Sequence, residues 1–223
     1  GGAYAIDPRR IHLVGHSNGG FMAHRMICEH DGLFAGIATL ASATYLDADA
    51  CTLETPVHVL QVHGTLDLVV LYGGGCFVSG GCYPSAVDTQ RYVAADNGCG
   101  DSPDPRQGEI DLVPGGGAES TISVFASTCA TGGSAELWTV PGAGHNPPFG
   151  TRFAEEVVAW LLARPGPMPE PDADLNGDDR VTAADLGILL ASWGDCAGCA
   201  ADFNGDGLVD YAAGAPGARA GAG

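Results

Sequence analysis

Apolar and polar residues follow two different periods along this chain. Five segments have the length and apolar content of β-strands, and they are residues 11–14, 33–41, 57–64, 121–127 and 136–141. Three further segments repeat apolar residues at the spacing of an α-helix, and they are residues 18–30, 85–97 and 151–164. Strands and helices that alternate in this way predict an α/β domain, with a mostly parallel sheet flanked by helices.

The same periodicity predicts which positions face the core. In residues 18–30 the expected apolar stripe is Phe21, Met22, Met26 and Ile27, and in residues 151–164 it is Phe153, Val157, Trp160 and Leu161. Residues 72–83 and 100–118 are rich in glycine, proline and polar residues instead, so we expect them to be loops.

A proline-rich stretch divides the chain. Residues 165–173 carry proline at every second position from 165 to 171, which is typical of an extended, stiff linker. Beyond it the sequence repeats itself, because Asp-Leu-Asn-Gly-Asp at residues 174–178 recurs as Asp-Phe-Asn-Gly-Asp at residues 202–206. We therefore expect a first domain at residues 1–164, a linker at residues 165–173 and a second domain at residues 174–223.

The net charge of the chain argues against some classes of binding partner. The 223 residues include 9 basic and 27 acidic side chains, which gives a formal net charge of −18. Such a chain is not expected to bind nucleic acid or an anionic membrane surface. No apolar run approaches the roughly 20 residues that a membrane span needs.

The eight cysteines indicate an oxidising compartment. They do not cluster with histidines as zinc ligands do, so disulfides are the better interpretation. Cys76 and Cys82 lie in one glycine-rich loop and could pair with each other. Cys196 and Cys199 are expected to form a local disulfide or to remain free thiols.

The strand at residues 11–14 runs into Gly15-His16-Ser17-Asn18-Gly19, and a helical pattern follows at once. This context is typical of a nucleophile elbow, a tight turn that exposes a serine hydroxyl. We expect Gly15 and Gly19 to remove side chains that would collide in the turn. The backbone N–H of Asn18 would then lie at a helix N-terminus, where it can stabilise an oxyanion.

A nucleophilic serine needs a base and an orienting acid, and hydrolases of this type supply them in the order Ser, Asp, His. Ser17, Asp67 and His145 fit that order: Asp67 follows the buried strand at residues 57–64, and His145 lies in a glycine-flanked loop after the last strand. His63 is a competing base, and Asp88 is an alternative acid.

The remaining histidines have weaker claims to a role in catalysis. His16 could line the pocket, His12 and His58 are expected to be packing residues within strands, and His24 and His30 belong to the helix after the elbow.

Residues 6–29, together with His63-Gly64-Thr65-Leu66-Asp67, Asn97-Gly98-Cys99 and Gly142-Ala143-Gly144-His145, resemble the secreted esterases related to polyhydroxybutyrate depolymerases and feruloyl esterases. The resemblance covers residues 1 to about 164. It implies an α/β-hydrolase fold, an extracellular location and ester hydrolysis without a cofactor. It also implies disulfides between Cys28 and Cys51 and between Cys99 and Cys129.

The chain departs from that family in two places. Asn146-Pro147-Pro148 stands where the family often has a tryptophan shortly after the histidine. The family's fold also places several strands, and a loop with a second oxyanion donor, before the elbow. We therefore expect this chain to be the C-terminal part of a longer esterase.

The second domain carries a pattern of oxygen ligands for a hard cation. Positions 1, 3, 5, 9 and 12 of a loop are filled by Asp174, Asn176, Asp178, Thr182 and Asp185, and Arg180 at position 7 would contribute its carbonyl. This is the spacing of an EF-hand calcium loop. With the helix expected at residues 186–193, it resembles a type I dockerin, a small α-helical module, which implies Ca²⁺ and a cohesin partner.

The second copy of the loop is incomplete. It begins well with Asp202, Asn204 and Asp206, but its twelfth position is Ala213, which cannot bind a cation. We expect little or no calcium binding there, and a disordered tail behind it.

Together these features predict an extracellular serine esterase with a calcium-binding tail. The expected substrates are feruloyl or acetyl esters on plant polysaccharide, with polyester as the second choice. The alternative is a catalytically incompetent hydrolase fragment that serves as a dockerin-borne binding or structural module.

Overall fold

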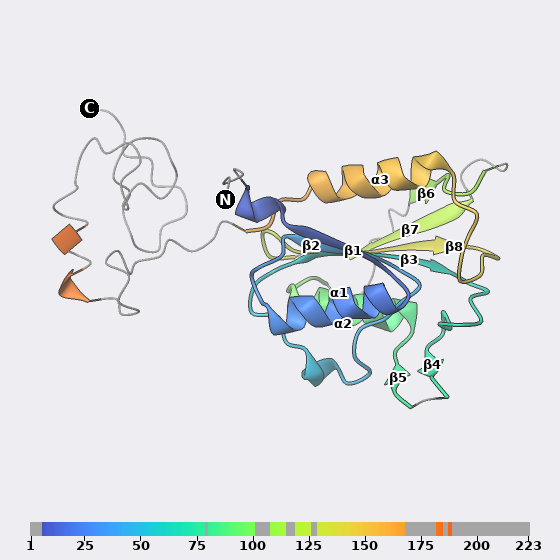
Figure 1. Ribbon diagram of the computed structural model, residues 1–223, viewed down its shortest axis with the longest axis horizontal. Coiled ribbons are helices and arrows are strands. Elements are labelled where there is room, and N and C mark those ends of the chain that lie inside the picture. Colours follow the sequence, from blue (N-terminus) through green and yellow to red (C-terminus); the bar gives the residue numbers. More distant parts are fainter. Residues whose placement is uncertain are drawn as a thin grey trace, which may run out of the picture. The chain divides into compact units, whose positions relative to one another are not determined.

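The computed structural model describes residues 6–78, 80–100, 108–114, 119–125, 129–167, 182–184 and 187–188. The chain divides into two compact units, Gly1–Pro169 and Glu170–Gly223, and the boundary falls inside the proline-rich stretch. Most of the described residues belong to the first unit, which carries the sheet and the helices discussed below (Figure 1). Within the described part of the chain, no helix is long and apolar enough to cross a membrane.

A six-stranded sheet with the order β1-β2-β3-β8-β7-β6 forms the centre of the first unit. Its strands are β1 (His12–His16), β2 (Gly36–Leu40), β3 (His58–Gly64), β8 (Ser134–Val140), β7 (Ser120–Phe125) and β6 (Gly108–Ile110). The first four are parallel to one another, whereas at one edge β7 pairs antiparallel with β8, and β6 pairs antiparallel with β7. The fold is therefore α/β with a mostly parallel sheet.

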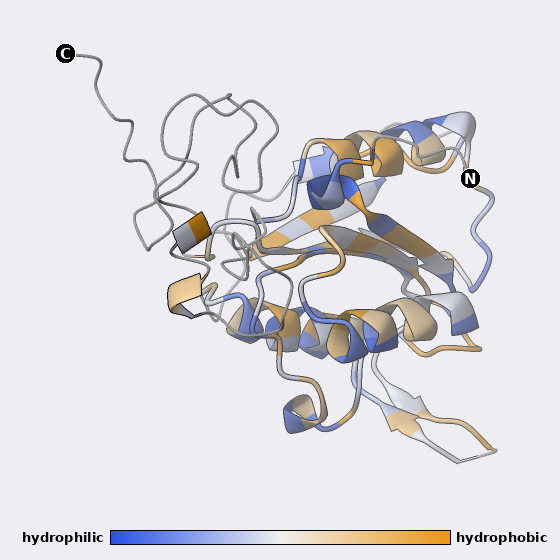
Figure 2. Ribbon diagram, turned by 60° about the vertical axis from the view of Figure 1, so that its left-hand side comes forward, coloured by the Kyte–Doolittle hydropathy of each residue, from blue (hydrophilic) through white to orange (hydrophobic). Residues whose placement is uncertain are grey.

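Helices cover both faces of this sheet. Helices α1 (Asn18–Glu29) and α2 (Ala86–Asp96) lie on one face, and α3 (Thr151–Leu162) lies on the other (Figure 1). Each helix carries both hydrophobic and hydrophilic residues (Figure 2), as a helix between a core and solvent requires. The shorter elements are two 3₁₀ turns, Pro8–Arg10 and Ala48–Ala50, and a small hairpin of β4 (Gly75–Cys76) and β5 (Cys82–Tyr83).

A hydrophobic core lies on each face of the sheet, and strand β3 contributes to both, because all seven of its residues are buried. Its successive side chains point to opposite faces of the sheet. Val59 thus packs in the cluster beneath α1 and α2, while Leu60 packs with Trp138 and Val157 beneath α3. A strand buried on both faces is expected at the centre of a parallel sheet.

The described part of the chain contains three disulfides, and Cys196 and Cys199 lie outside it. Cys28–Cys51 joins the end of α1 to the chain after the second 3₁₀ turn, and Cys99–Cys129 joins the chain after α2 to the chain before β8. The third, Cys76–Cys82, closes the hairpin. These are the two pairings that the family resemblance implied and the local pairing that the loop allowed.

The buried face of α1 differs from the predicted stripe. Met22 is 50% exposed, and the buried positions are Gly20, Ala23, His24 and Ile27. These four residues follow the i, i+3, i+4, i+7 spacing of one helix face. Close packing at the elbow sets which side of the helix is buried. A Cβ added to Gly20 would lie 2.5 Å from the Ser42 hydroxyl oxygen, because the Gly20 side of α1 already packs closely there.

Two of the expected loops contain strands. Residues 108–110 form β6 and pair with β7. Ile110, the last residue of β6, and Leu112 are buried in the core beneath α3. The hairpin of β4 and β5 lies within the other predicted loop. Strands of two or three residues are too short to produce a readable alternation of apolar and polar positions.

Gly15 and Gly19 of the elbow differ in what a side chain would contact. A Cβ on Gly15 would collide with the backbone of Gly19 and Gly20, whereas a Cβ on Gly19 would meet no atom within 4 Å. The expectation that Gly19 must also lack a side chain is therefore wrong. The close contact is between the end of β1 and the first turn of α1, and Gly15 permits it.

We predict opposite effects of the same substitution at these two glycines. Gly15→Ala should lower the free energy of unfolding by about 1–3 kcal/mol, as overpacking does, because backbone must move to admit the methyl group. Gly19→Ala should leave stability unchanged or raise it by up to about 1 kcal/mol, since alanine favours helix. Urea denaturation of the two variants measures both changes, and equal losses would contradict this packing of the elbow.

Candidate active site

The elbow holds Ser17 in an unusual backbone conformation. Its φ of 53° and ψ of −120° lie outside the regions that residues with a Cβ prefer. Such a conformation costs on the order of 1–3 kcal/mol and persists only where neighbouring structure enforces it. Here the Ser17 N–H donates to the Leu40 carbonyl at 2.8 Å, and the Ser17 carbonyl accepts from Gly20 and Phe21 at 2.9 and 3.1 Å.

The Ser17 hydroxyl is available because it does not cap its own helix. Serine at this position usually accepts a hydrogen bond from the first turn of the helix. Ser17 makes no such side-chain bond, and its Oγ lies 2.9 Å from Nε2 of His145 instead. The tight turn thus points the hydroxyl away from the helix and towards an imidazole.

The structure brings Ser17, His145 and Asp67 into one line. Nδ1 of His145 lies 2.8 Å from Oδ2 of Asp67, while its Nε2 faces Ser17. The three residues follow β1, β8 and β3, which are parallel, so all three lie at the carboxyl edge of the sheet. Sites on open α/β sheets gather at this edge.

Hydrogen bonds from His145 and from two backbone N–H groups keep the Asp67 carboxylate ionised. Its side chain is fully buried, and Oδ1 accepts from the N–H groups of Val69 and Val70 at 2.8 and 2.9 Å. Burial raises the pKa of Asp67, but the hydrogen bonds from His145, Val70 and Val69 outweigh this effect and hold the pKa below its ordinary value. The carboxylate therefore remains charged beside His145.

Neither competing residue occupies a place in this line. Nε2 of His63 lies 2.9 Å from the Val70 carbonyl and 3.5 Å from Oδ2 of Asp67, so His145, and not His63, lies between Asp67 and Ser17. Asp88 lies in the first turn of α2, where it accepts from the Ser85 hydroxyl at 2.6 Å and from Arg91 at 3.1 Å.

His16 lies directly against His145. The two rings are 4.8 Å apart, and Nε2 of His16 contacts the His145 carbonyl at 3.1 Å. His24 and His58 are buried, and burial lowers the pKa of each to about 4, so both are neutral at ordinary pH. His12 is partly buried in β1, and His30 is exposed at the end of α1.

Asn18 is the first residue of α1, so its N–H is one of the donors that a helix leaves unpaired at its N-terminus. In the described part of the chain no hydrogen bond uses this N–H. An anion beside Ser17 would meet it, and the helix dipole favours negative charge at the same place.

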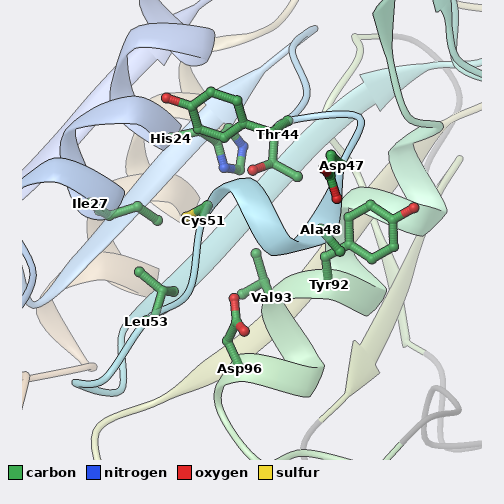
Figure 3. Close-up of a pocket in the computed structure, with 11 residues that line it drawn as sticks. His24, Ile27, Thr44, Asp47, Ala48, Cys51, Leu53, Tyr92, Val93 and Asp96 are labelled. Atoms are coloured by element: carbon green, nitrogen blue, oxygen red, sulfur yellow. The ribbon is translucent and has the colours of Figure 1, made fainter.

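A small pocket beneath α1 is separate from these residues. It has a volume of about 10 Å³, and residues on α1, α2 and the segment between β2 and β3 line it, including His24, Asp47 and Asp96 (Figure 3). This volume is close to the space of one water molecule, so an ester cannot enter. Ser17, Asp67 and His145 are not among the residues that line it.

The predicted calcium ligands fall almost entirely outside the described residues. This applies to Asp174, Asn176, Asp178, Arg180, Asp185, Asp202, Asn204 and Asp206. Thr182 is described, and its hydroxyl accepts from the Ala184 N–H at 3.2 Å. Among the residues that the structure does describe, no group of three or more His, Cys, Asp or Glu side chains is arranged to hold a metal ion.

No family model matches the sequence. Two curated proteins do. The protein named "Putative esterase NocK" from Nocardia uniformis subsp. tsuyamanensis is 28% identical over 157 residues, which are 67% of this chain and 46% of that protein. "Feruloyl esterase B" from Piromyces equi is 30% identical over 147 residues, which are 63% of this chain and 25% of that protein.

The chain is similar to esterases. It spans about half the length of the first relative and a quarter of the second.

The sequence did not reveal the backbone contacts that hold the acid. The pattern of side chains contains nothing that marks the N–H groups of Val69 and Val70 as donors to Asp67. The only local signal is that an aspartate often accepts N–H groups two or three residues further on.

Proposed function

We propose that the protein hydrolyses carboxylic esters with Ser17 as the nucleophile, His145 as the base and then the acid, and Asp67 as the residue that orients His145. The observation that carries this proposal is the unbroken contact from Asp67 Oδ2 through the His145 ring to Ser17 Oγ, at 2.8 and 2.9 Å. A buried carboxylate, an imidazole and a strained serine have this arrangement in serine hydrolases.

The first half of the reaction transfers the acyl group to the protein. His145 Nε2 takes the proton of the Ser17 hydroxyl while Oγ attacks the ester carbonyl carbon. The electron pair of the carbonyl π bond moves to the carbonyl oxygen, which becomes the oxyanion of a tetrahedral intermediate. The Asn18 N–H would stabilise this oxyanion. The bond to the alcohol oxygen then breaks, and the imidazolium returns its proton to the leaving alcohol.

The second half regenerates Ser17. His145 removes a proton from water, whose oxygen attacks the acyl-serine, and the proton passes to Ser17 Oγ as the carboxylic acid leaves. In both halves the imidazolium is the charged form, and the ionised Asp67 beside Nδ1 stabilises it and fixes the ring.

The substrate and the compartment are part of the proposal. Three disulfides support an extracellular location and an oxidising environment. The resemblance of the motifs and the name of one relative, feruloyl esterase B, favour a feruloyl or acetyl ester of plant polysaccharide and an α/β-hydrolase fold. A polyester is the second candidate, since the motifs also resemble polyhydroxybutyrate depolymerases.

We predict that Ser17→Ala and Asp67→Asn each abolish or strongly lower the esterase activity without unfolding the protein. Loss of the nucleophile should lower the hydrolysis of p-nitrophenyl acetate to the background rate. Loss of the orienting charge should lower kcat by about 10³- to 10⁴-fold, because the imidazole is then free to adopt the wrong tautomer. Release of p-nitrophenol, measured alongside circular dichroism, reports both properties.

Asp88→Asn provides the matched control for the acid, because it removes the same charge from an aspartate that is bonded to Ser85 and Arg91 on α2 and lies outside the line of Ser17, His145 and Asp67. It should leave kcat within about twofold of the wild type. If Asp88→Asn is the damaging change, or if Ser17→Ala retains activity, the assignment of roles is wrong. A wild type that is folded but inactive would favour the non-catalytic alternative.

We also propose that residues 174–185 bind one calcium ion. The support is chemical: three carboxylates, an amide oxygen and a hydroxyl at EF-hand spacing suit a hard cation that prefers oxygen ligands. The resemblance to a type I dockerin makes a cohesin domain the proposed partner of this segment. The second loop lacks its last ligand, because position 12 is Ala213.

Titration of the full chain with CaCl₂ in a calorimeter should therefore give a stoichiometry near one. Asp174→Ala should abolish the signal, whereas Asp172→Ala, which removes the same charge just before the loop, should not. A stoichiometry near two would mean that the second loop binds despite Ala213. The absence of binding would remove the physical basis of the calcium proposal.

A further inference from the structure

Buried polar side chains lie behind Asp67 and take no part in the proposed chemistry. His63 and Gln61 lie on β3, Gln90 lies on α2, and their side chains are 1%, 0% and 0% exposed. Burying such groups costs free energy unless they are hydrogen-bonded. The hydrogen bonds of these three side chains therefore indicate which part of the site they hold in place.

The hydrogen bonds fix the tautomer of His63. Its Nε2 lies 2.9 Å from the Val70 carbonyl, and because a carbonyl only accepts, Nε2 must carry the proton. Nδ1 is then an acceptor, and the Gln61 amide donates to it at 3.2 Å. Gln61 in turn accepts from the Gln90 amide at 3.4 Å. Each side chain in this series therefore donates a hydrogen bond to the next one, and His63 donates to Val70.

Two hydrogen bonds hold the Val70 residue, one to its N–H and one to its carbonyl. Its N–H donates to Oδ1 of Asp67 at 2.9 Å, and its carbonyl accepts from His63 at 2.9 Å. The turn that presents the Val69 and Val70 N–H groups to Asp67 is thus anchored from behind by an imidazole. With Oδ1 occupied in this way, Oδ2 is left to face His145.

Burial of His63 favours the neutral ring that this role requires. Burial lowers the pKa of His63, and the nearby His145 acts in the same direction, while the Val70 carbonyl and Asp67 partly offset them. A neutral ring with hydrogen on Nε2 can donate to Val70 without placing a second cation beside Asp67. Oδ2 of Asp67 is then left to stabilise the imidazolium that forms on His145 during the reaction.

We propose that His63 is a positioning residue: its Nε2–H anchors the Val70 carbonyl and thereby sets the orientation and the ionisation of Asp67. The kinetic part of this inference rests on the proposed esterase activity. The effect on the Asp67 carboxylate does not depend on that activity, so the two can fail separately.

The test compares two amides at position 63. The side-chain nitrogen of glutamine reaches the place of Nε2, whereas that of asparagine reaches only as far as Nδ1. His63→Gln should therefore keep the bond to Val70, and His63→Asn and His63→Leu should lose it. His24→Leu is the control for loss of a buried histidine, because His24 is 1% exposed and neither of its ring nitrogens has a hydrogen-bond partner.

In the kinetic test, His63→Asn and His63→Leu should lower kcat about 10- to 100-fold, by analogy with the residues that orient metal ligands from behind. KM should stay within about twofold, since His63 does not touch substrate. His63→Gln and His24→Leu should resemble the wild type in both quantities.

The second test needs no activity. Asp67 is followed by carboxyl-carbon NMR in protein labelled with ¹³C-aspartate, and its signal is assigned by its loss in Asp67→Asn. Its pKa should rise in His63→Asn and His63→Leu but not in His63→Gln or His24→Leu. An inactive wild type that still shows this pattern would overturn the esterase proposal and keep the role of His63. Equal titration curves for the asparagine and glutamine variants would overturn the role of His63, and so would equal loss of the fold in both.

Discussion

The parallel pairing of β1, β2, β3 and β8 is the constraint on which the site depends. Residues 17, 67 and 145 are far apart along the chain, yet each follows a strand whose carboxyl end lies at the same edge. The backbone of each turn then completes the placement. Ser17 is fixed by the bond of its N–H to Leu40, and Asp67 is fixed by the N–H groups of the two valines that follow it.

Two buried carboxylates of this protein are stabilised in different ways. Glu136, beneath α3, lies 2.9 Å from Arg164 and accepts from the indole N–H groups of Trp138 and Trp160 at 2.7 and 2.8 Å. Asp67 has backbone N–H groups and histidines as neighbours, and no arginine of the described part of the chain contributes to its pKa. A permanent cation would compete with His145 for the carboxylate. Hydrogen bonds from His145 and from the backbone keep the carboxylate ionised without such a cation.

Local signals in the sequence were sufficient to predict five strands of the sheet, though not β6, and the residues that meet at its edge. The elbow could be read because glycine spacing, a preceding strand and a following helix coincide at Ser17. The phase of α1 could not, because Met22 is as apolar as a core residue, and the close packing of Gly20 on Ser42 is visible only in three dimensions. The proposed role of His63 was equally hidden, since its partners are the main-chain carbonyl of Val70 and the amide of Gln61.

The central claim, that Ser17 is a nucleophile activated by His145, is tested most directly by a covalent probe. A fluorophosphonate loses fluoride when an activated serine oxygen attacks its phosphorus, so the product marks the residue that reacted. Mass spectrometry of the digested protein should find one adduct, on the peptide that contains Ser17, and Asp67→Asn should form it much more slowly. Folded protein that remains unlabelled, or that carries its adduct on another residue, would contradict the account.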